Sequence, residues 1–162
     1  MRKQLFLLVL IIIMTTACGS TPKFSSVTGK EWKLIEVHVT EVLTGAEDTS
    51  RINERDILFD RKTLTDEDAG DYFIFNIDDE NISGTGAPNR YAGQYTLGDS
   101  QAISLSPERS TTIPPLKQPE KLREQDFFIY MQNVYKWNLV NKKLELYSKT
   151  EDDTEVRMVF SL

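Results

Sequence analysis

Short segments in which apolar and polar residues alternate run through most of this chain, and they constrain its fold more than any other feature. Alternation with a period of two is the pattern of half-buried β-strands. The segments that predict strands are residues 31–40, 57–59, 72–77, 82–83, 90–97, 102–106, 137–140, 143–148 and 155–162. Turn-forming residues separate several of them, at 78–81, 98–99, 141–142 and 151–153. An antiparallel, mostly β domain follows.

One segment follows helical spacing instead. Pro119, after Gln118, suits a first helical position, and Glu120 is expected in the first turn, where the helix dipole favours acids. Leu122 and Tyr130 flank a stripe of apolar residues three and four apart, formed by Phe127, Phe128, Met131, Val134 and Tyr135. The expected fold is therefore α+β, with a curled antiparallel β-sheet wrapped around one amphipathic helix.

The N-terminus differs in character from the rest of the chain. Arg2 and Lys3 precede an unbroken apolar run over residues 5–14, and small residues follow it. A basic start, an apolar run and small residues predict a signal peptide over residues 1–17. The run is shorter than the roughly 20 residues of a membrane-spanning helix.

Cys18 is the only cysteine, so it cannot close a disulfide within the chain. Its position directly after Thr15, Thr16 and Ala17 resembles the lipobox of bacterial lipoproteins, which implies cleavage before Cys18 and its acylation with palmitate-like chains. Residues 18–27 would then be a lipidated tether and residues 28–162 the domain. The alternative is an ordinary cleaved signal peptide with Cys18 unmodified.

The net charge of the chain indicates which classes of partner it can bind. Without Arg2 and Lys3 the chain carries 17 basic and 25 acidic residues, a net charge near −8. Such a surface repels nucleic acid and anionic lipid heads, so we expect no nucleic-acid partner. The membrane would hold the protein through its lipid. The expected location is the cell envelope: the outer membrane facing the periplasm, or the outer face of the plasma membrane in a Gram-positive cell.

Candidate catalytic and metal-binding groups are few. His38, the only histidine, lies between Val37 and Val39 on the first predicted strand, where a surface or rim position is expected. Metal sites and nucleophilic catalysis mostly use histidine or cysteine, so we expect no catalytic residue, no metal and no cofactor. The chain is predicted not to be an enzyme.

Acidic and glycine-rich segments have simpler explanations than ligand sites. The acidic clusters are expected to be solvated turns, with weak divalent-ion binding as the alternative. These clusters are residues 66–68 with Asp71, residues 78–80 and residues 151–153. Gly84, Gly86 and Gly93 predict a turn and close packing between strands, because no helix start follows them as in a phosphate loop.

Three groups of residues resemble the META/HslJ-like family in order and spacing. Gly29, Trp32 and Leu34 match its opening motif. The middle motif is met by Ser83, Gly84, Asn89, Tyr91, Gly93 and Tyr95, and the helix motif by Glu124, Phe127, Phe128, Met131 and Val134. Aromatic and leucine-rich strands follow, as at Trp137, Leu144, Leu146 and Phe160. The resemblance implies structural roles for these residues and a cracked-barrel-like form of the curled antiparallel β-sheet described above.

Two departures affect the family's cysteine positions. Its Gly-Cys-Asn is replaced by Ala87, Pro88 and Asn89, and a second cysteine position is occupied by Pro115. The resemblance to HslJ-like proteins implies a role in envelope stress tolerance or in binding a protein partner. A similarity to secretin pilot lipoproteins implies a groove for a partner helix or an acyl chain. Lipidation, small size and acidity together leave open an inhibitor of a basic envelope hydrolase such as lysozyme.

Overall fold

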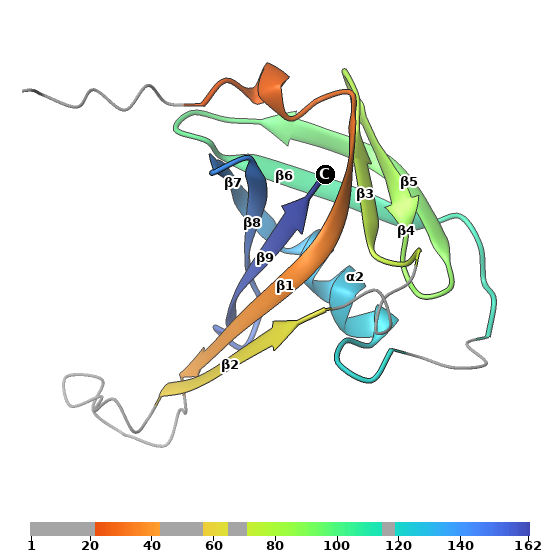
Figure 1. The fold of residues 1–162 in the computed structure, drawn as a ribbon, viewed down its shortest axis with the longest axis vertical. Coiled ribbons are helices and arrows are strands. Elements are labelled where there is room, and N and C mark those ends of the chain that lie inside the picture. Colours follow the sequence, from red (N-terminus) through yellow and green to blue (C-terminus); the bar gives the residue numbers. More distant parts are fainter. Residues whose placement is uncertain (1–21, 43–56, 65–70, 115–118) are drawn as a thin grey trace, which may run out of the picture.

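The computed structural model describes residues 22–42, 57–64, 71–114 and 119–162 (Figure 1). The predicted signal peptide, Cys18 and the first part of the tether lie outside the described residues. No helix within the described ranges combines the length and the apolar character needed to cross a membrane.

The described elements are mostly strands. In chain order they are η1 (Phe24–Ser26), β1 (Lys30–Val42), β2 (Ile57–Thr63), β3 (Ile74–Ile77), β4 (Asn81–Thr85), β5 (Arg90–Leu97), β6 (Ile103–Arg109), α2 (Glu124–Gln132), β7 (Val134–Val140), β8 (Lys143–Lys149) and β9 (Glu155–Ser161). Each strand predicted from the alternating pattern is present, with shifted ends at most of them.

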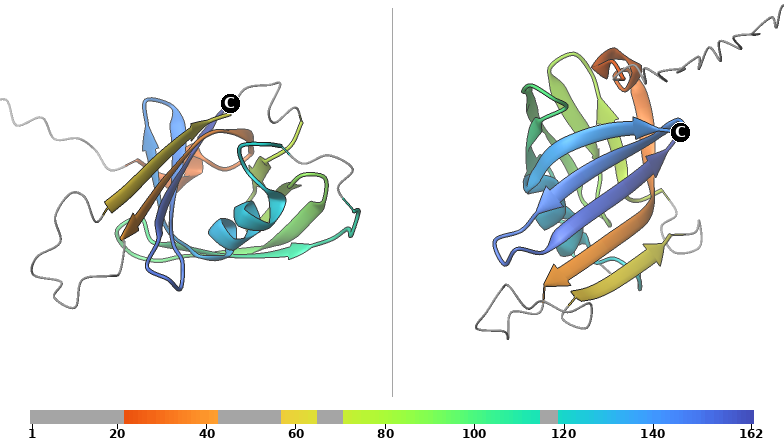
Figure 2. Two further views of the ribbon diagram at one scale, coloured as in Figure 1. Left: turned by 90° about the horizontal axis from the view of Figure 1, so that it is seen from below. Right: turned by 90° about the vertical axis from the view of Figure 1, so that its left-hand side faces the viewer.

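All strands join one antiparallel sheet in the order β6-β5-β4-β3-β1-β9-β8-β7 (Figure 1). The long strand β1 pairs with β9 along one edge, and along the other it pairs first with β3 and then with β2. Ala102, just before β6, forms an isolated bridge to Lys136 on β7, and the Trp137 N–H donates to the Gln101 carbonyl at 3.0 Å. The sheet therefore curls into a nearly closed barrel, as the two views of Figure 2 show. The predicted curled antiparallel sheet with one helix is confirmed.

Glycines permit the tight curl of the sheet. A Cβ atom on Gly84 of β4 would lie 1.9 Å from the Ile74 carbonyl oxygen, and one on Gly93 of β5 would lie 2.1 Å from the Ser106 carbonyl oxygen. Tyr91 is the cross-strand partner of Gly84, and its hydroxyl donates to the Ile74 carbonyl at 2.8 Å. The aromatic side chain covers the space that the glycine leaves. Burial raises the pKa of the Tyr91 hydroxyl well above its usual range.

The predicted turns are present at the hairpins. Asn141 and Lys142 both have positive φ angles, 50° and 65°, as a two-residue turn between β7 and β8 requires. Between β3 and β4, the Asp78 carboxylate accepts hydrogen bonds from the Glu80 and Asn81 N–H groups. These backbone hydrogen bonds lower the pKa of Asp78, because they favour its charged form.

The helix is shorter than the sequence pattern predicts. It begins at Glu124 rather than at Pro119, and Arg123 precedes it with extended backbone. It ends at Gln132, so Val134 and Tyr135 belong to β7, and Tyr135 is exposed. The Asn133 carbonyl accepts from the Lys149 N–H at 3.2 Å, which places the chain beside β8 immediately after the helix. The helical assignment of Val134 and Tyr135 was wrong because sheet pairing ends the helix at this point.

The core fills the space between the sheet and the helix. Trp32, Leu34, Val37 and Val39 of β1 are buried. Aromatic rings from distant segments meet in it: Phe73 lies 5.1 Å from Phe127, measured between ring centroids. The other large side chains that are fully buried include Phe75, Ile77, Ile82, Tyr91, Met131, Leu144, Leu146 and Phe160. The core therefore fixes the position of α2 against the sheet.

Candidate functional site

A buried carboxylate fixes the start of α2. Glu124 is 5% exposed, and its Oε1 atom accepts hydrogen bonds from the Ala87 and Asn89 N–H groups, each at 2.6 Å. Its Oε2 atom accepts from the Asn89 side-chain amide at 2.8 Å. These three hydrogen bonds tie the helix to the loop between β4 and β5. Burial of a carboxylate is costly unless it is hydrogen-bonded, and here both oxygens are.

Asn89 extends this connection to the chain after β6. Its Oδ1 atom accepts from the Ile113 N–H at 2.6 Å and from the Thr111 hydroxyl at 3.1 Å. Its Nδ2 atom also donates to the Ile113 carbonyl at 3.1 Å. Glu124 and Asn89 therefore form one network, here called the Glu124 clasp, that joins α2, the β4–β5 loop and residues 111–113.

The clasp leaves no room for a side chain at Gly86. A Cβ atom there would lie 2.6 Å from Glu124 Oε1 and 3.0 Å from the Phe128 ring. The loop backbone thus approaches the helix closely enough for its N–H groups to reach the carboxylate. This close approach confirms the packing role that the sequence predicts for this glycine.

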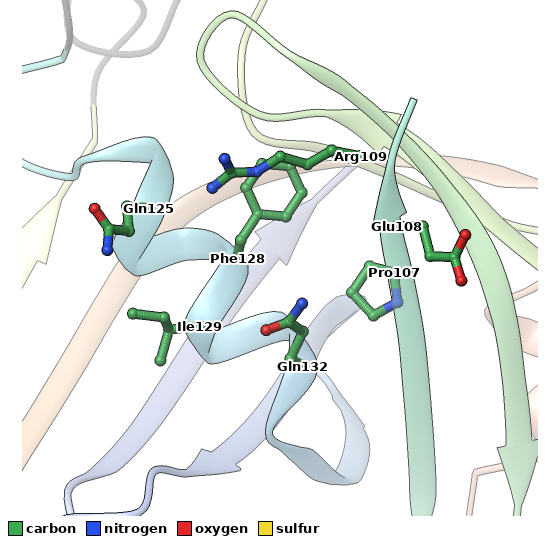
Figure 3. A pocket seen from close by; sticks show the side chains of 7 residues that line it. All are labelled: Pro107, Glu108, Arg109, Gln125, Phe128, Ile129 and Gln132. Carbon is green, nitrogen blue, oxygen red and sulfur yellow. The ribbon is translucent and has the colours of Figure 1, made fainter. Parts of the chain in front are cut away.

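A groove lies between α2 and β6, next to the clasp (Figure 3). One part has a volume of about 510 Å³ and is lined by Pro107, Glu108, Arg109, Gln125, Phe128, Ile129 and Gln132. An adjoining part of about 470 Å³ is lined by Asn89, Arg109, Thr112, Ile113, Pro114, Glu124 and Gln125. The two parts share Arg109 and Gln125 as lining residues and so lie next to each other; together they are here called the α2–β6 groove.

Arg109 lies over the floor of this groove. Its guanidinium is 4.6 Å from the centroid of the Phe128 ring, and Figure 3 shows the two side chains stacked. A cation over an aromatic face is attracted by the ring quadrupole. No carboxylate among the described residues lies within ion-pair distance of Arg109, whereas Arg123 pairs with Asp126 at 2.8 Å. In Figure 3 the Glu108 side chain points away from α2.

Two large apolar side chains are exposed beside the groove. Ile129 of α2 is 38% exposed and Ile113 is 50% exposed. They lie on opposite sides of Arg109, because each lines a different part of the groove. Sequence reasoning missed the groove residues Arg109, Ile113, Gln125 and Ile129. The only signal for them was Ile129, an apolar residue outside the buried stripe of the helix.

Most of the family-motif residues lie in the core or in the backbone framework. Gly29 has a φ of +70°, just before β1. The Tyr95 hydroxyl donates to the Asp78 and Asp79 carbonyls, at 2.9 and 2.8 Å. The motif residues that are buried are Trp32, Leu34, Asn89, Tyr91, Glu124, Phe127, Phe128, Met131 and Val134. The structure brings Asn89, Glu124 and Phe128 together at the groove.

His38 lies away from the groove, on the face of β1 opposite the core. Its Nε2 atom is 3.0 Å from the Glu36 carboxylate, and its Nδ1 atom is 3.3 Å from the Arg157 guanidinium. The residue is buried, at 8% exposed, so the expected surface or rim position was wrong; Glu36 and Arg157 contact its two ring nitrogens. Across the described segments, no three His, Cys, Asp or Glu side chains are grouped closely enough to hold a metal ion.

The two acidic clusters that the structure describes form turns. Asp78 binds backbone N–H groups, and the Asp152 carboxylate accepts a hydrogen bond from the Thr150 hydroxyl. The cluster at 66–68 lies outside the described residues, as does Pro115. Asn89 follows Pro88, the first altered cysteine position, and is hydrogen-bonded to Ile113. The chain beside Pro88 therefore lies next to the segment that leads to Pro115, the second altered position.

Two solved structures and one protein family match this chain. A protein from Burkholderia xenovorans solved by NMR has a similar fold, with a TM-score of 0.53 at 13% identity and coverage of 85% of each chain. A DUF4847 family protein from Bacteroides vulgatus gives a TM-score of 0.48 at 10% identity, covering 83% of this chain and 94% of that one. No curated protein matches the sequence. The profile of the META domain matches residues 25–159, and the chain therefore belongs to the META domain family.

Proposed function

We propose that this protein is a lipid-anchored component of the bacterial cell envelope whose META domain binds a protein partner and catalyses no reaction. The observation that carries the proposal is the α2–β6 groove, with Ile113 and Ile129 exposed on either side of it. A concave surface with uncovered apolar side chains and a few polar groups is typical of binding sites.

The groups around the groove support binding rather than catalysis. Glu124, its buried carboxylate, already accepts three hydrogen bonds and is poorly placed to take a proton from a substrate. His38 lies on the outer face of β1, paired with Glu36 and Arg157. The remaining polar groups of the lining are amides, hydroxyls, Glu108 and Arg109, which suit recognition.

The groove also favours docking of a partner segment over inhibition of a basic hydrolase. Inhibition of a basic hydrolase through acidic turns would use exposed carboxylates such as those at 78–80 and 151–153. The groove instead has a cation, Arg109, over an aromatic floor. We therefore favour docking of a partner segment into the groove, as in the pilot-like alternative. Acylation of Cys18 would hold the domain at the membrane where that partner is assembled or stabilised during envelope stress.

Site-specific photocrosslinking tests this proposal, because the chain offers matched control positions. A photoreactive amino acid replaces Ile129 or Ile113 in the full chain expressed in bacteria. The controls are Val140, 39% exposed, and Leu97, 49% exposed, neither of which lines the groove. The exposures of each pair agree to within one percentage point, so solvent access alone predicts equal yields.

We expect one discrete protein adduct from positions 129 and 113 and none from positions 140 and 97. Addition of Ile129→Asp should remove the adduct formed at position 113, because the carboxylate would be placed against the apolar part of the groove. Equal labelling at all four positions, or at none of them, would contradict groove binding.

A further inference from the structure

We propose that the α2–β6 groove receives an extended segment of the partner protein, and that Arg109 binds a carboxylate in the middle of that segment. This inference rests on the groove binding proposed above and specifies the chemistry of the occupant. Three features of the groove carry it: an unpaired cation held in place, an open strand edge, and apolar side chains on both sides of the cation.

The first feature is the state of Arg109. Stacking on Phe128, which is 4% exposed, holds the face of the guanidinium 4.6 Å above the ring. The N–H donors of a guanidinium lie in its plane, so contact of its face with an aromatic ring leaves them available to a ligand, and Arg109 lines both parts of the groove. Arg123 and Arg157 have carboxylate partners, but Arg109 has none among the described residues. An arginine that has no carboxylate partner among the described residues and lies in a concave site is complementary to a carboxylate from outside.

The second feature is the outer edge of β6. The Ser110 N–H donates to the Arg90 carbonyl, and the Gly98 N–H donates to the Ala102 carbonyl. These two bonds establish which residues of β6 bond to β5. In this antiparallel ladder, the N–H and C=O groups of even-numbered β6 residues bond to β5, and those of odd-numbered residues point away from β5. Leu105 and Arg109 therefore direct N–H and C=O groups to the open side, and Pro107 directs its carbonyl there. No described residue forms a backbone hydrogen bond with this edge between Ile103 and Arg109.

An open strand edge pairs with extended chain rather than with a helix, whose backbone groups are already paired. The helical wall is α2, nine residues long. At about 1.5 Å per residue it spans roughly 13 Å, which is the length of about four extended residues. The groove therefore fits a short extended segment along β6.

The third feature sets the sequence of that segment. Ile129 lines the part of the groove on one side of Arg109, and Ile113 lines the part on the other side. An occupant that covers both would present apolar side chains on both sides of its carboxylate. We thus assign to the groove a partner segment in which an aspartate or glutamate lies between apolar residues.

Two short capped peptides test this assignment. One has a central glutamate flanked by leucines, and the other has glutamine in place of the glutamate. Each is titrated into the ¹⁵N-labelled full chain in mild detergent, and the backbone amide shifts are followed by NMR. We expect both peptides to shift Arg109, Gln125 and Ile129, with the glutamate peptide binding about fivefold more tightly, as one partly exposed ion pair allows.

Variants separate the carboxylate from the groove itself. Arg109→Gln should reduce the ratio of the two dissociation constants to about one, whereas Ile129→Asp should abolish binding of both peptides. Val140→Asp is the matched control and should change neither. Equal binding of the two peptides to the unmodified chain would overturn the role of Arg109 and leave groove binding intact. Absence of shifts in the groove with both peptides would overturn the extended occupant, and the crosslinking experiment then decides on the groove independently.

Discussion

Replacing Glu124 with glutamine should strongly destabilise the domain. The amide oxygen can occupy the Oε1 position and still accept from the Ala87 and Asn89 N–H groups, as a weaker, neutral acceptor. The amide nitrogen then occupies the Oε2 position, 2.8 Å from Asn89 Nδ2, where two donors face each other. Asn89 cannot turn over to relieve this contact, because its Oδ1 atom already accepts from Ile113 and Thr111.

The cost follows from these contacts. One hydrogen bond is lost with its buried donor unsatisfied, at about 1–3 kcal/mol, and two more become neutral, at roughly 0.5 kcal/mol each. The sum, about 2–4 kcal/mol, is a large part of the 5–15 kcal/mol typical of a whole domain. At roughly 4 °C for each kcal/mol in a domain of this size, the melting temperature should fall by about 8–16 °C.

Thermal and urea denaturation, followed by circular dichroism, measure this change. Asp126→Asn is the matched control, since it removes an acid from the same helical turn. Its partner Arg123 is largely exposed, so we expect melting within about 2 °C of the unmodified protein. If Glu124→Gln melts as close to the unmodified protein as this control does, the clasp does not fix the helix and our account of its position is wrong.

Four further results are expected. Phe128→Ala should destabilise the domain by about 3–5 kcal/mol, because it leaves a cavity under Arg109; an unchanged midpoint of urea denaturation would contradict this. Tyr91→Phe should cost only about 1 kcal/mol, because the ring still covers Gly84 and only the bond to the Ile74 carbonyl is lost. Cys18→Ser should abolish incorporation of labelled palmitate and release the chain from the membrane fraction; continued labelling would refute the anchor. Raising salt to 1 M, where the Debye length is about 3 Å, should change crosslinking at position 129 less than threefold, whereas capture steered by acidic turns would collapse.

The strands were predictable because their pattern is local. Along β5, alternation between the two faces gave both ends of the strand correctly, Arg90 and Leu97. The boundary between α2 and β7 was not predictable in the same way. Val134 fits helical spacing after Phe127 and Met131, and it also fits a strand that leads to Trp137. The choice is made by Lys149, whose N–H donates to the Asn133 carbonyl, and that contact is distant in sequence.

The start of α2 is also set by contacts between residues that are distant in the sequence. Pro119 and Glu120 satisfy the local preferences of a helix start, yet Glu124 is the first helical residue. Its carboxylate is held by N–H groups 37 and 35 residues earlier in the chain. A local pattern contains no information on such a contact. The family resemblance included Glu124 and Asn89 among the motif residues, but it did not predict that their side chains are hydrogen-bonded to each other.

The clasp explains how the family-motif residues and the groove can occupy the same place. Glu124 and Asn89 fix the first turn of α2, and this fixes the direction in which the next turns present Gln125, Phe128 and Ile129. The same Asn89 holds Ile113 on the far side of Arg109. Arg109 and Ile129 are themselves not needed for the clasp, since neither contacts Glu124 through a hydrogen bond in the described residues. Substitutions at Arg109 or Ile129 should therefore leave the framework intact, as is expected where a surface is carried on a separate structural framework.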